Sequence, residues 1–198
     1  MKEVLQDLRE LSACVSALEW VRRNSHKTPM EHRTPMELWY ACSVPNWLMW
    51  LLFRKSEESG WPDAIAVRYL LCDVVEEYAV GAFKQSNNFK NIAILKAGLD
   101  ASRKYLRGEY STRDLYASIT LILSDVLPSS RSMECHACCA VCEAGDVVVT
   151  KPPYGFIRAH NAVCSTVDAF VLGSLHGDFS SVQKDICDFV RGRVSVPL

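Results

Sequence analysis

Residues 34–53, which read TPMELWYACSVPNWLMWLLF, decide the fold that the sequence predicts. This segment holds three of the five tryptophans and begins two short helices, each with a proline at its start. Thr34 can cap the first helix, and Glu37 stands three residues later, where a capping box has its carboxylate. Because each large aromatic side chain removes roughly 150–250 Å² from water, we expect this helical hairpin to form the centre of the core.

Composition and charge restrict the class of protein. With 49% hydrophobic and 23% charged residues among 198, the chain can bury a large core and is not disordered. A formal net charge of −1 gives no general attraction to nucleic acid or to an anionic membrane. The longest dense apolar run, residues 47–53, is too short to span a bilayer. Nine cysteines without an export signal indicate free thiols and a cytoplasmic location.

Apolar residues recur at helical spacing along most of the chain, which predicts an all-α protein, a compact bundle of eight or nine helices. Besides the hairpin, the expected helices cover residues 2–23, 61–83, 92–106, 111–126, 154–175 and 178–191. The sequence of residues 28–31 repeats that of residues 34–37 and predicts a second possible helix start. Residues 145–153 are interpreted as an extended linker between a helical domain, 1–144, and a C-terminal helical pair, 154–198, packed on the same core.

The sharpest candidate for chemistry is the run CHACCAVC at residues 135–142, whose thiols and histidine offer enough soft ligands for Zn²⁺. On a helix its four cysteines fall on one stripe: Cys135, Cys138, Cys139 and Cys142. The ends of that stripe are about 10 Å apart at ~1.5 Å rise per residue, whereas four sulfurs around one zinc lie within about 4 Å. We therefore prefer a packed core helix. Zinc binding, with help from His160 or Cys164, and reactive thiols stay open as alternatives.

Other polar groups are interpreted as structural. His160 and Cys164 are four residues apart, so a thiol–imidazole pair is possible, but no orienting carboxylate or oxyanion hole is evident. Asn46 is interpreted as a helix cap or a buried hydrogen-bonding group, and residues 76–77, two adjacent glutamates, as a solvated face. One helix carries a basic row that is most simply a solvent face: Lys96, Arg103, Lys104 and Arg107.

The amino-terminal third resembles a family of small bacterial and phage immunity proteins. The matching positions are Ala13-Cys14, Glu19-Trp20, Trp39, Cys42 and the run from Asn46 to Leu51. The resemblance covers residues 10–55, with two departures: Asn46 replaces the aspartate usual in the family, and residues 24–33 look inserted. It implies a helical protein that neutralises another protein, and it supplies no catalytic residues.

From these features we expect a non-enzymatic inhibitor without a cofactor, which binds a toxin or a host or defence enzyme through a helical surface. Self-association is left open. Because aromatic and arginine anchors dominate such interfaces, the predicted partner-binding residues are Trp61, Arg103, Arg107, Tyr110, Tyr154 and Phe156. Two alternatives remain, a zinc- or thiol-dependent protein based on residues 135–142 and a nucleic-acid-binding protein based on the basic row.

Overall fold

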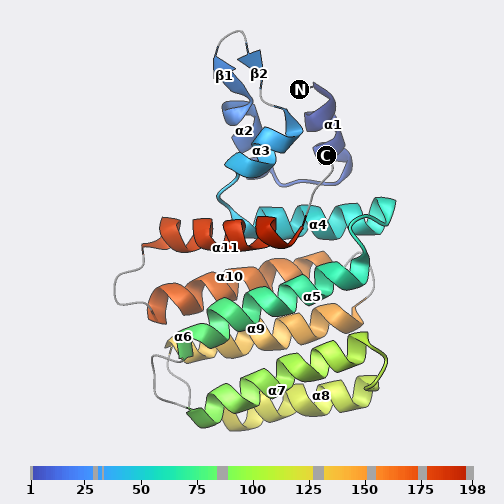
Figure 1. Ribbon diagram of the computed structural model, residues 1–198, viewed down its shortest axis with the longest axis vertical. Coiled ribbons are helices and arrows are strands. Elements are labelled where there is room, and N and C mark those ends of the chain that lie inside the picture. Colours follow the sequence, from blue (N-terminus) through green and yellow to red (C-terminus); the bar gives the residue numbers. More distant parts are fainter. Residues whose placement is uncertain are drawn as a thin grey trace.

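The computed structural model describes residues 2–28, 31–32, 34–83, 89–126, 132–150, 155–173 and 178–194. Nearly all of these residues are helical, and the described ranges contain one short β-ribbon (Figure 1). The prediction of an all-α bundle is therefore confirmed. The helices in the described ranges are somewhat more numerous than the eight or nine predicted.

The first described elements form what we call the N-terminal layer, at the top of Figure 1. It consists of α1 (Lys2–Glu10), α2 (Val15–Asn24), the antiparallel strands β1 (His26–Thr28) and β2 (Glu31–His32), and α3 (Pro35–Ala41). Below it lie α4 (Pro45–Ser59), α5 (Ala64–Val74), the π-helix η1 (Val75–Val80), α6 (Gly81–Phe83), α7 (Phe89–Leu106), α8 (Thr112–Leu121), the π-helix η3 (Ile122–Val126), α9 (Ser132–Val149), α10 (Gly155–Gly173) and α11 (Phe179–Arg193).

The predicted helix over residues 2–23 is interrupted. Ser12 has a φ of 64°, in the left-handed region. The Ala13 amide donates to the Leu8 carbonyl at 2.8 Å, and the Ser12 amide to the Arg9 carbonyl at 2.9 Å. These are the two hydrogen bonds of a Schellman motif, which ends α1 and turns the chain toward α2.

The second predicted helix start, at residues 28–31, is wrong. Thr28 and Glu31 pair across the β-ribbon instead. At Thr34 both capping-box hydrogen bonds form: the Thr34 amide donates to Glu37 at 2.8 Å, and the Glu37 amide donates to the Thr34 hydroxyl at 3.2 Å. A short helix needs an apolar face to bury. Buried Leu38 and Trp39 supply it after Thr34, whereas polar residues follow residues 28–31.

The predicted linker at residues 145–153 is wrong over residues 145–149, which complete α9. Val147 and Val148 are buried in the bundle, and this packing outweighs the modest helix preference of valine. Residues 151–154 lie outside the described ranges. Helices α10 and α11 belong to the same apolar cluster as α4, α5, α7, α8 and α9.

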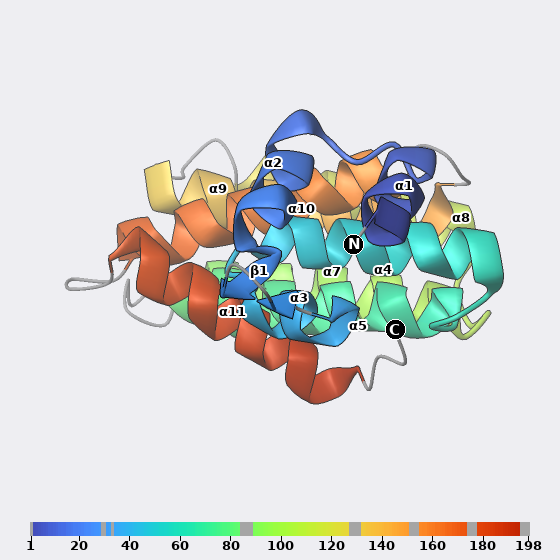
Figure 2. The same cartoon turned by 90° about the horizontal axis from the view of Figure 1, so that it is seen from above.

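The centre of the bundle also differs from the prediction. Helices α9 and α10 pack against each other more extensively than any other pair among the described residues, and they lie in the middle layers of Figure 1. Six alanines on these two helices are completely buried: Ala137, Ala140, Ala144, Ala159, Ala162 and Ala169. The tryptophan hairpin lies instead at the edge of the bundle, where the N-terminal layer covers α4 (Figure 2). Helices with small side chains occupy the centre because these side chains allow the two helices to approach closely.

Candidate functional site: a cavity lined by tryptophan

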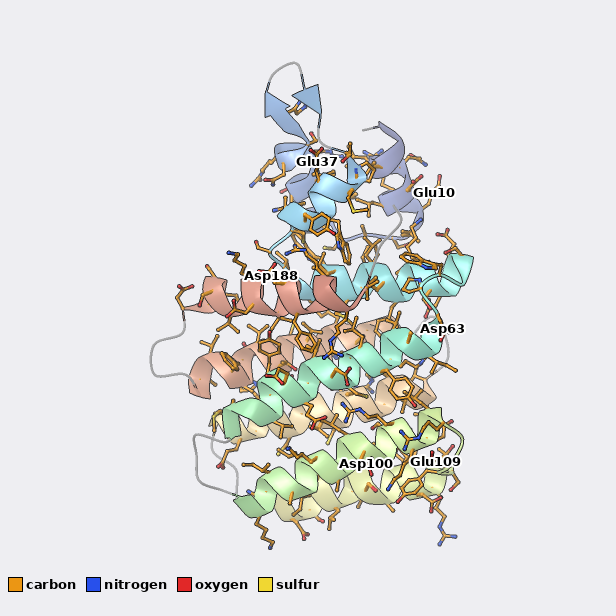
Figure 3. All side chains as sticks on the ribbon, viewed as in Figure 1. Glu10, Glu37, Asp63, Asp100, Glu109 and Asp188 are labelled. Atoms are coloured by element: carbon orange, nitrogen blue, oxygen red, sulfur yellow. The ribbon has the colours of Figure 1, made fainter. Side chains whose placement is uncertain are left out.

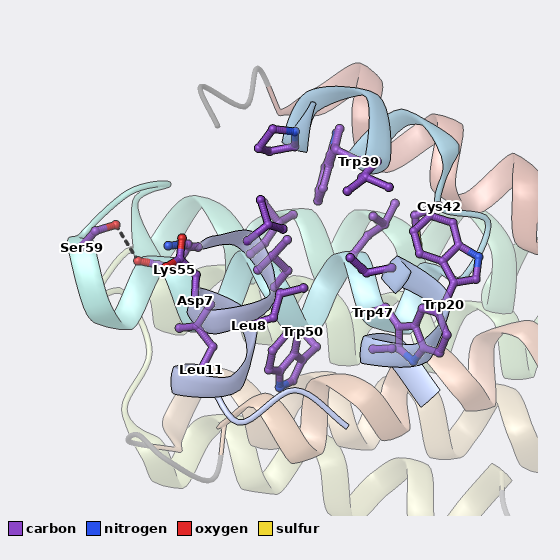
Figure 4. Close-up of a pocket in the computed structure, with 18 of the residues that line it drawn as sticks. Asp7, Leu8, Leu11, Trp20, Trp39, Cys42, Trp47, Trp50, Lys55 and Ser59 are labelled. Carbon is purple, nitrogen blue, oxygen red and sulfur yellow. Dashed lines mark hydrogen bonds between the residues drawn. The ribbon is translucent and has the colours of Figure 1, made fainter. Parts of the chain in front are cut away.

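A cavity of about 510 Å³ separates the N-terminal layer from α4. All five tryptophans of the chain line it: Trp20 from α2, Trp39 from α3, Trp47 and Trp50 from α4, and Trp61 after α4. Figure 4 labels the first four of them. The remaining walls are mainly leucine, valine, alanine and proline, with three polar side chains, Asp7, Lys55 and Ser59. The cavity is therefore almost entirely apolar and partly open to solvent.

Helix α4 has two apolar faces, and this explains the position of its tryptophans. Met49 and Phe53 are buried in the bundle. Trp47, Trp50 and Leu51, at helical spacing on another side, line the cavity. The prediction that these residues share one face is compatible with the structure. Their face borders the cavity, and Trp47 and Leu51 also pack against the apolar cluster of the bundle.

Two arginines of the bundle hold the N-terminal layer in place. Arg54 Nε of α4 donates to the Leu11 carbonyl at 3.1 Å, just after α1. Arg191 of α11, whose side chain is 9% exposed, donates through Nη2 to the Trp39 carbonyl at 2.9 Å and also to the Cys42 carbonyl. The last carbonyls of a helix lack intrahelical partners and carry partial negative charge. Both guanidinium groups therefore satisfy helix ends that border the cavity.

The two ends of the cavity differ in chemistry. At one end Trp20 and Trp47 meet edge to face, with ring centroids 6.3 Å apart and an interplanar angle of 67°. Asp7, Lys55 and Ser59 lie toward the opposite end in Figure 4. The Ser59 hydroxyl donates to the Lys55 carbonyl at 2.8 Å and is 3.2 Å from the carbonyl of Trp61, so Trp61 lies at the same polar end.

The six predicted partner-binding residues do not form one surface. Trp61 lines the cavity. Arg103, Arg107 and Tyr110 gather near the end of α7, in a different part of the bundle, where Figure 3 labels Asp100 and Glu109. Phe156 lies in the first turn of α10, but its side chain is outside the described part of the structure, as is the whole of Tyr154.

The basic row is largely neutralised by carboxylates. Arg103 contacts Asp73 and Glu76, each at 2.7 Å. Burial lowers the pKa of Arg103, but the hydrogen bonds to these two carboxylates outweigh it, so the pKa is raised. Lys104 lies 2.8 Å from Asp100, and its hydrogen bond raises the Lys104 pKa. A bidentate pair joins Arg107 to Glu109, and Lys96 borders an acidic depression with Asp73, Glu76 and Glu77. This face is poorly suited to bind phosphates.

Residues 135–142 lie within α9, so the prediction of a helix is confirmed. Cys138 is buried, and the other three thiols are half-buried. Burial raises the pKa of Cys142 to about 12, and it also raises that of Cys139. Among the residues that the structure describes, no group of three or more His, Cys, Asp or Glu side chains is placed to hold a metal ion. Because residues 135–142 are helical, their four thiols lie in the single stripe that the spacing predicts. Zinc binding by these residues stays a prediction.

The structure adds Asn46 to the His160–Cys164 pair that the four-residue spacing made possible. Asn46 Nδ2 lies 3.3 Å from His160 Nδ1 and 3.7 Å from the Cys164 sulfur, and His160 Nε2 is 3.6 Å from that sulfur. Burial, followed by the charge of Asp168, raises the pKa of Cys164, whereas Asn46 lowers it. A nucleophilic cysteine requires a depressed pKa. This group therefore links α4 to α10 without activating the thiol.

Comparisons with protein-family models, curated proteins and solved structures found no match for this chain. The resemblance to immunity proteins over residues 10–55 consequently stays a prediction. Over the described ranges, no helix combines the length and apolar character needed to cross a membrane. Sequence reasoning missed the cavity, although one signal was present. Tryptophans on α4 occupy a face separate from Met49 and Phe53, so that helix needs a second apolar neighbour.

Proposed function

We propose that the protein is a non-enzymatic binding protein that holds an apolar ligand in the tryptophan cavity. The observation that supports this function is the convergence of all five tryptophans on one cavity of about 510 Å³. Sites for small molecules typically have volumes of 300–1,000 Å³, apolar walls and a few polar groups that orient the ligand. The cavity beneath the N-terminal layer has each of these properties.

An unfilled apolar space of this size is unusual in a packed protein. Interiors are close-packed, and voids much larger than a water molecule are few. An engineered cavity of about 150 Å³ lined by apolar side chains stays dry and takes up benzene. The tryptophan cavity is larger and its walls are equally apolar, so an apolar ligand would recover the contacts that the walls lack.

Binding is favoured over catalysis by the residues that line the cavity. Cys42 is the one thiol in the lining; its sulfur donates to the Val44 carbonyl at 3.7 Å, and burial raises its pKa. Within the described lining no histidine accompanies it as a base. The inhibitor role inferred from the sequence stays a prediction, and the anchors that the structure describes, Trp61, Arg103, Arg107 and Tyr110, lie in two separate regions.

The proposal is tested by titrating the protein with n-decanol, a neutral aliphatic alcohol. All of the tryptophan fluorescence comes from the cavity walls, so occupancy is expected to shift the emission spectrum. A ligand that binds only the folded state also raises the melting temperature. At a free concentration of a hundred times its Kd, it increases the free energy of unfolding by ~2.7 kcal/mol.

A cavity-filling variant and a matched control sharpen this test. Ala17 of α2 lines the cavity, so Ala17→Phe is expected to abolish the spectral response while the protein stays folded. Tyr40 of α3 is exposed outside the lining, so Tyr40→Ala is expected to bind normally. Absence of a response in the wild-type protein, or an unchanged response in Ala17→Phe, would overturn the proposed function.

A further inference from the structure

The charges at the polar end of the cavity are not balanced. Lys55 Nζ lies 3.7 Å from Glu58 and thus has an anionic neighbour. The Asp7 carboxylate, by contrast, has no hydrogen bond or ion pair with any described residue. A ligand that reaches this end meets an unpaired anion on Asp7 and a cation that already has a partner.

One further feature of this end favours a cation. Trp61 lines the cavity, and its backbone forms hydrogen bonds with the Ser59 hydroxyl at this end. The face of an indole ring attracts ammonium groups, with tryptophan the strongest of the aromatic side chains. The carboxyl end of α1 adds little, because the Leu11 carbonyl accepts a hydrogen bond from Arg54. The Asp7 carboxylate and the indole together form surroundings that complement positive charge.

From this asymmetry we infer that the ligand is a cationic amphiphile, an aliphatic or aromatic body that carries one amine or quaternary ammonium group. The apolar body occupies the space between Trp20, Trp47 and Trp50, and the ammonium group lies between Asp7 and Trp61. This inference rests on the proposed function, because it requires that the cavity takes up an apolar ligand at all.

The test compares three ligands with the same ten-carbon chain, each below its critical micelle concentration: decyltrimethylammonium, n-decanol and decanoate. Tryptophan emission reports binding of each. We expect decyltrimethylammonium to bind about tenfold more tightly than n-decanol, within the range of a cation–aromatic contact plus a nearby carboxylate. Decanoate is expected to bind most weakly, and added salt should reduce the preference for the cation.

Two variants of α1 assign the effect to a residue. Asp7→Asn is expected to reduce the preference for decyltrimethylammonium over n-decanol to the part that Trp61 supplies, about two- to threefold, and to leave n-decanol binding unchanged. Glu10→Gln removes a carboxylate from the same exposed helix but outside the cavity lining, and it is expected to have no effect.

The outcomes separate this inference from the proposed function. Equal binding of all three ligands would overturn the inferred ligand class and leave the proposed function standing. Tightest binding of decanoate, lost in Lys55→Gln, would likewise overturn it and assign the polar end to an anion. Failure of every ligand to bind would overturn both. A cation preference that is undiminished in Asp7→Asn would refute the role of this carboxylate.

Discussion

The α9–α10 pair and the tryptophan cavity are built from opposite kinds of side chain. Helices α9 and α10 meet through alanine and cysteine, and their interface is filled. The cavity is walled by the five largest side chains of the chain, and it remains open. Large side chains supply more apolar area, but they also hold the N-terminal layer away from α4. The region with the smaller residues is therefore the better packed.

Two glycines show how closely the helices around α9 approach. A Cβ atom on Gly145 of α9 would lie 2.5 Å from Ile119 Cδ1, and one on Gly98 of α7 would lie 2.5 Å from Ile122 Cδ1. The comparison teaches that a cysteine-rich stripe, which suggests chemistry, lies on a closely packed helix, whereas a tryptophan-rich stripe, which suggests a core, lines the candidate binding site.

The largest effect is expected from placing the same substitution in both regions. Ala140 of α9 is completely buried, and Ala140→Leu should lower the free energy of unfolding by about 3 kcal/mol because the packed interface has no room. Ala17 lines the cavity, which has room for a larger side chain. Ala17→Leu should therefore leave the free energy of unfolding unchanged or raise it by up to about 1 kcal/mol. Urea denaturation measures both. Similar losses in the two variants would refute the contrast in packing.

A smaller effect is expected from loosening the N-terminal layer alone. Arg191→Met removes hydrogen bonds to the Trp39 and Cys42 carbonyls, which should cost about 2 kcal/mol for a charged donor. Hydrogen exchange followed by mass spectrometry should show faster exchange in α1–α3 and unchanged protection in α9 and α10. Uniform loss of protection in both regions would mean that the layer and the bundle unfold as one unit.

The buried thiols should make the bundle sensitive to alkaline pH. Burial raises the pKa of Cys187 from 9.0 to about 12, so the unfolded chain releases this proton first as pH rises. The associated stability is fully present below pH 9 and is lost as pH rises from there through 12. For one thiol the slope is at most about 1.4 kcal/mol per pH unit. Urea denaturation at pH 8 and 10.5 should therefore show a smaller loss in Cys187→Ala than in the wild-type protein.

The smallest effect, close to zero, is expected from a chelator. The four thiols of residues 135–142 lie along one helix, which cannot bring them around a single ion. Treatment with EDTA should leave the melting temperature unchanged, and elemental analysis of protein purified without chelator should find no stoichiometric zinc. A fall in melting temperature accompanied by release of zinc would show that the stripe has a chemical role after all.

Much of the fold could be predicted from local pattern. The capping box at Thr34 forms as predicted, with both hydrogen bonds, and the structure shows a second one between Ser111 and Asp114. The helical stripe of residues 135–142 follows from its spacing. The hydrogen bonds of Asn46 could not be predicted, because its partners His160 and Cys164 are more than a hundred residues away. The break at Ser12 and the helical state of residues 145–149 could not be predicted either, because intrinsic helix propensity says nothing about packing against other elements.

The sequence by itself determined the helical class, most helix starts and the nearly neutral net charge, since these depend on periodicity, caps and composition. The tertiary structure alone decided which apolar faces meet. Side-chain size and helix approach together determine whether an interface is filled or leaves a space, and that is a property of pairs of elements. For this reason the five tryptophans could be counted in the sequence, but their convergence on one cavity could be seen only in the folded chain.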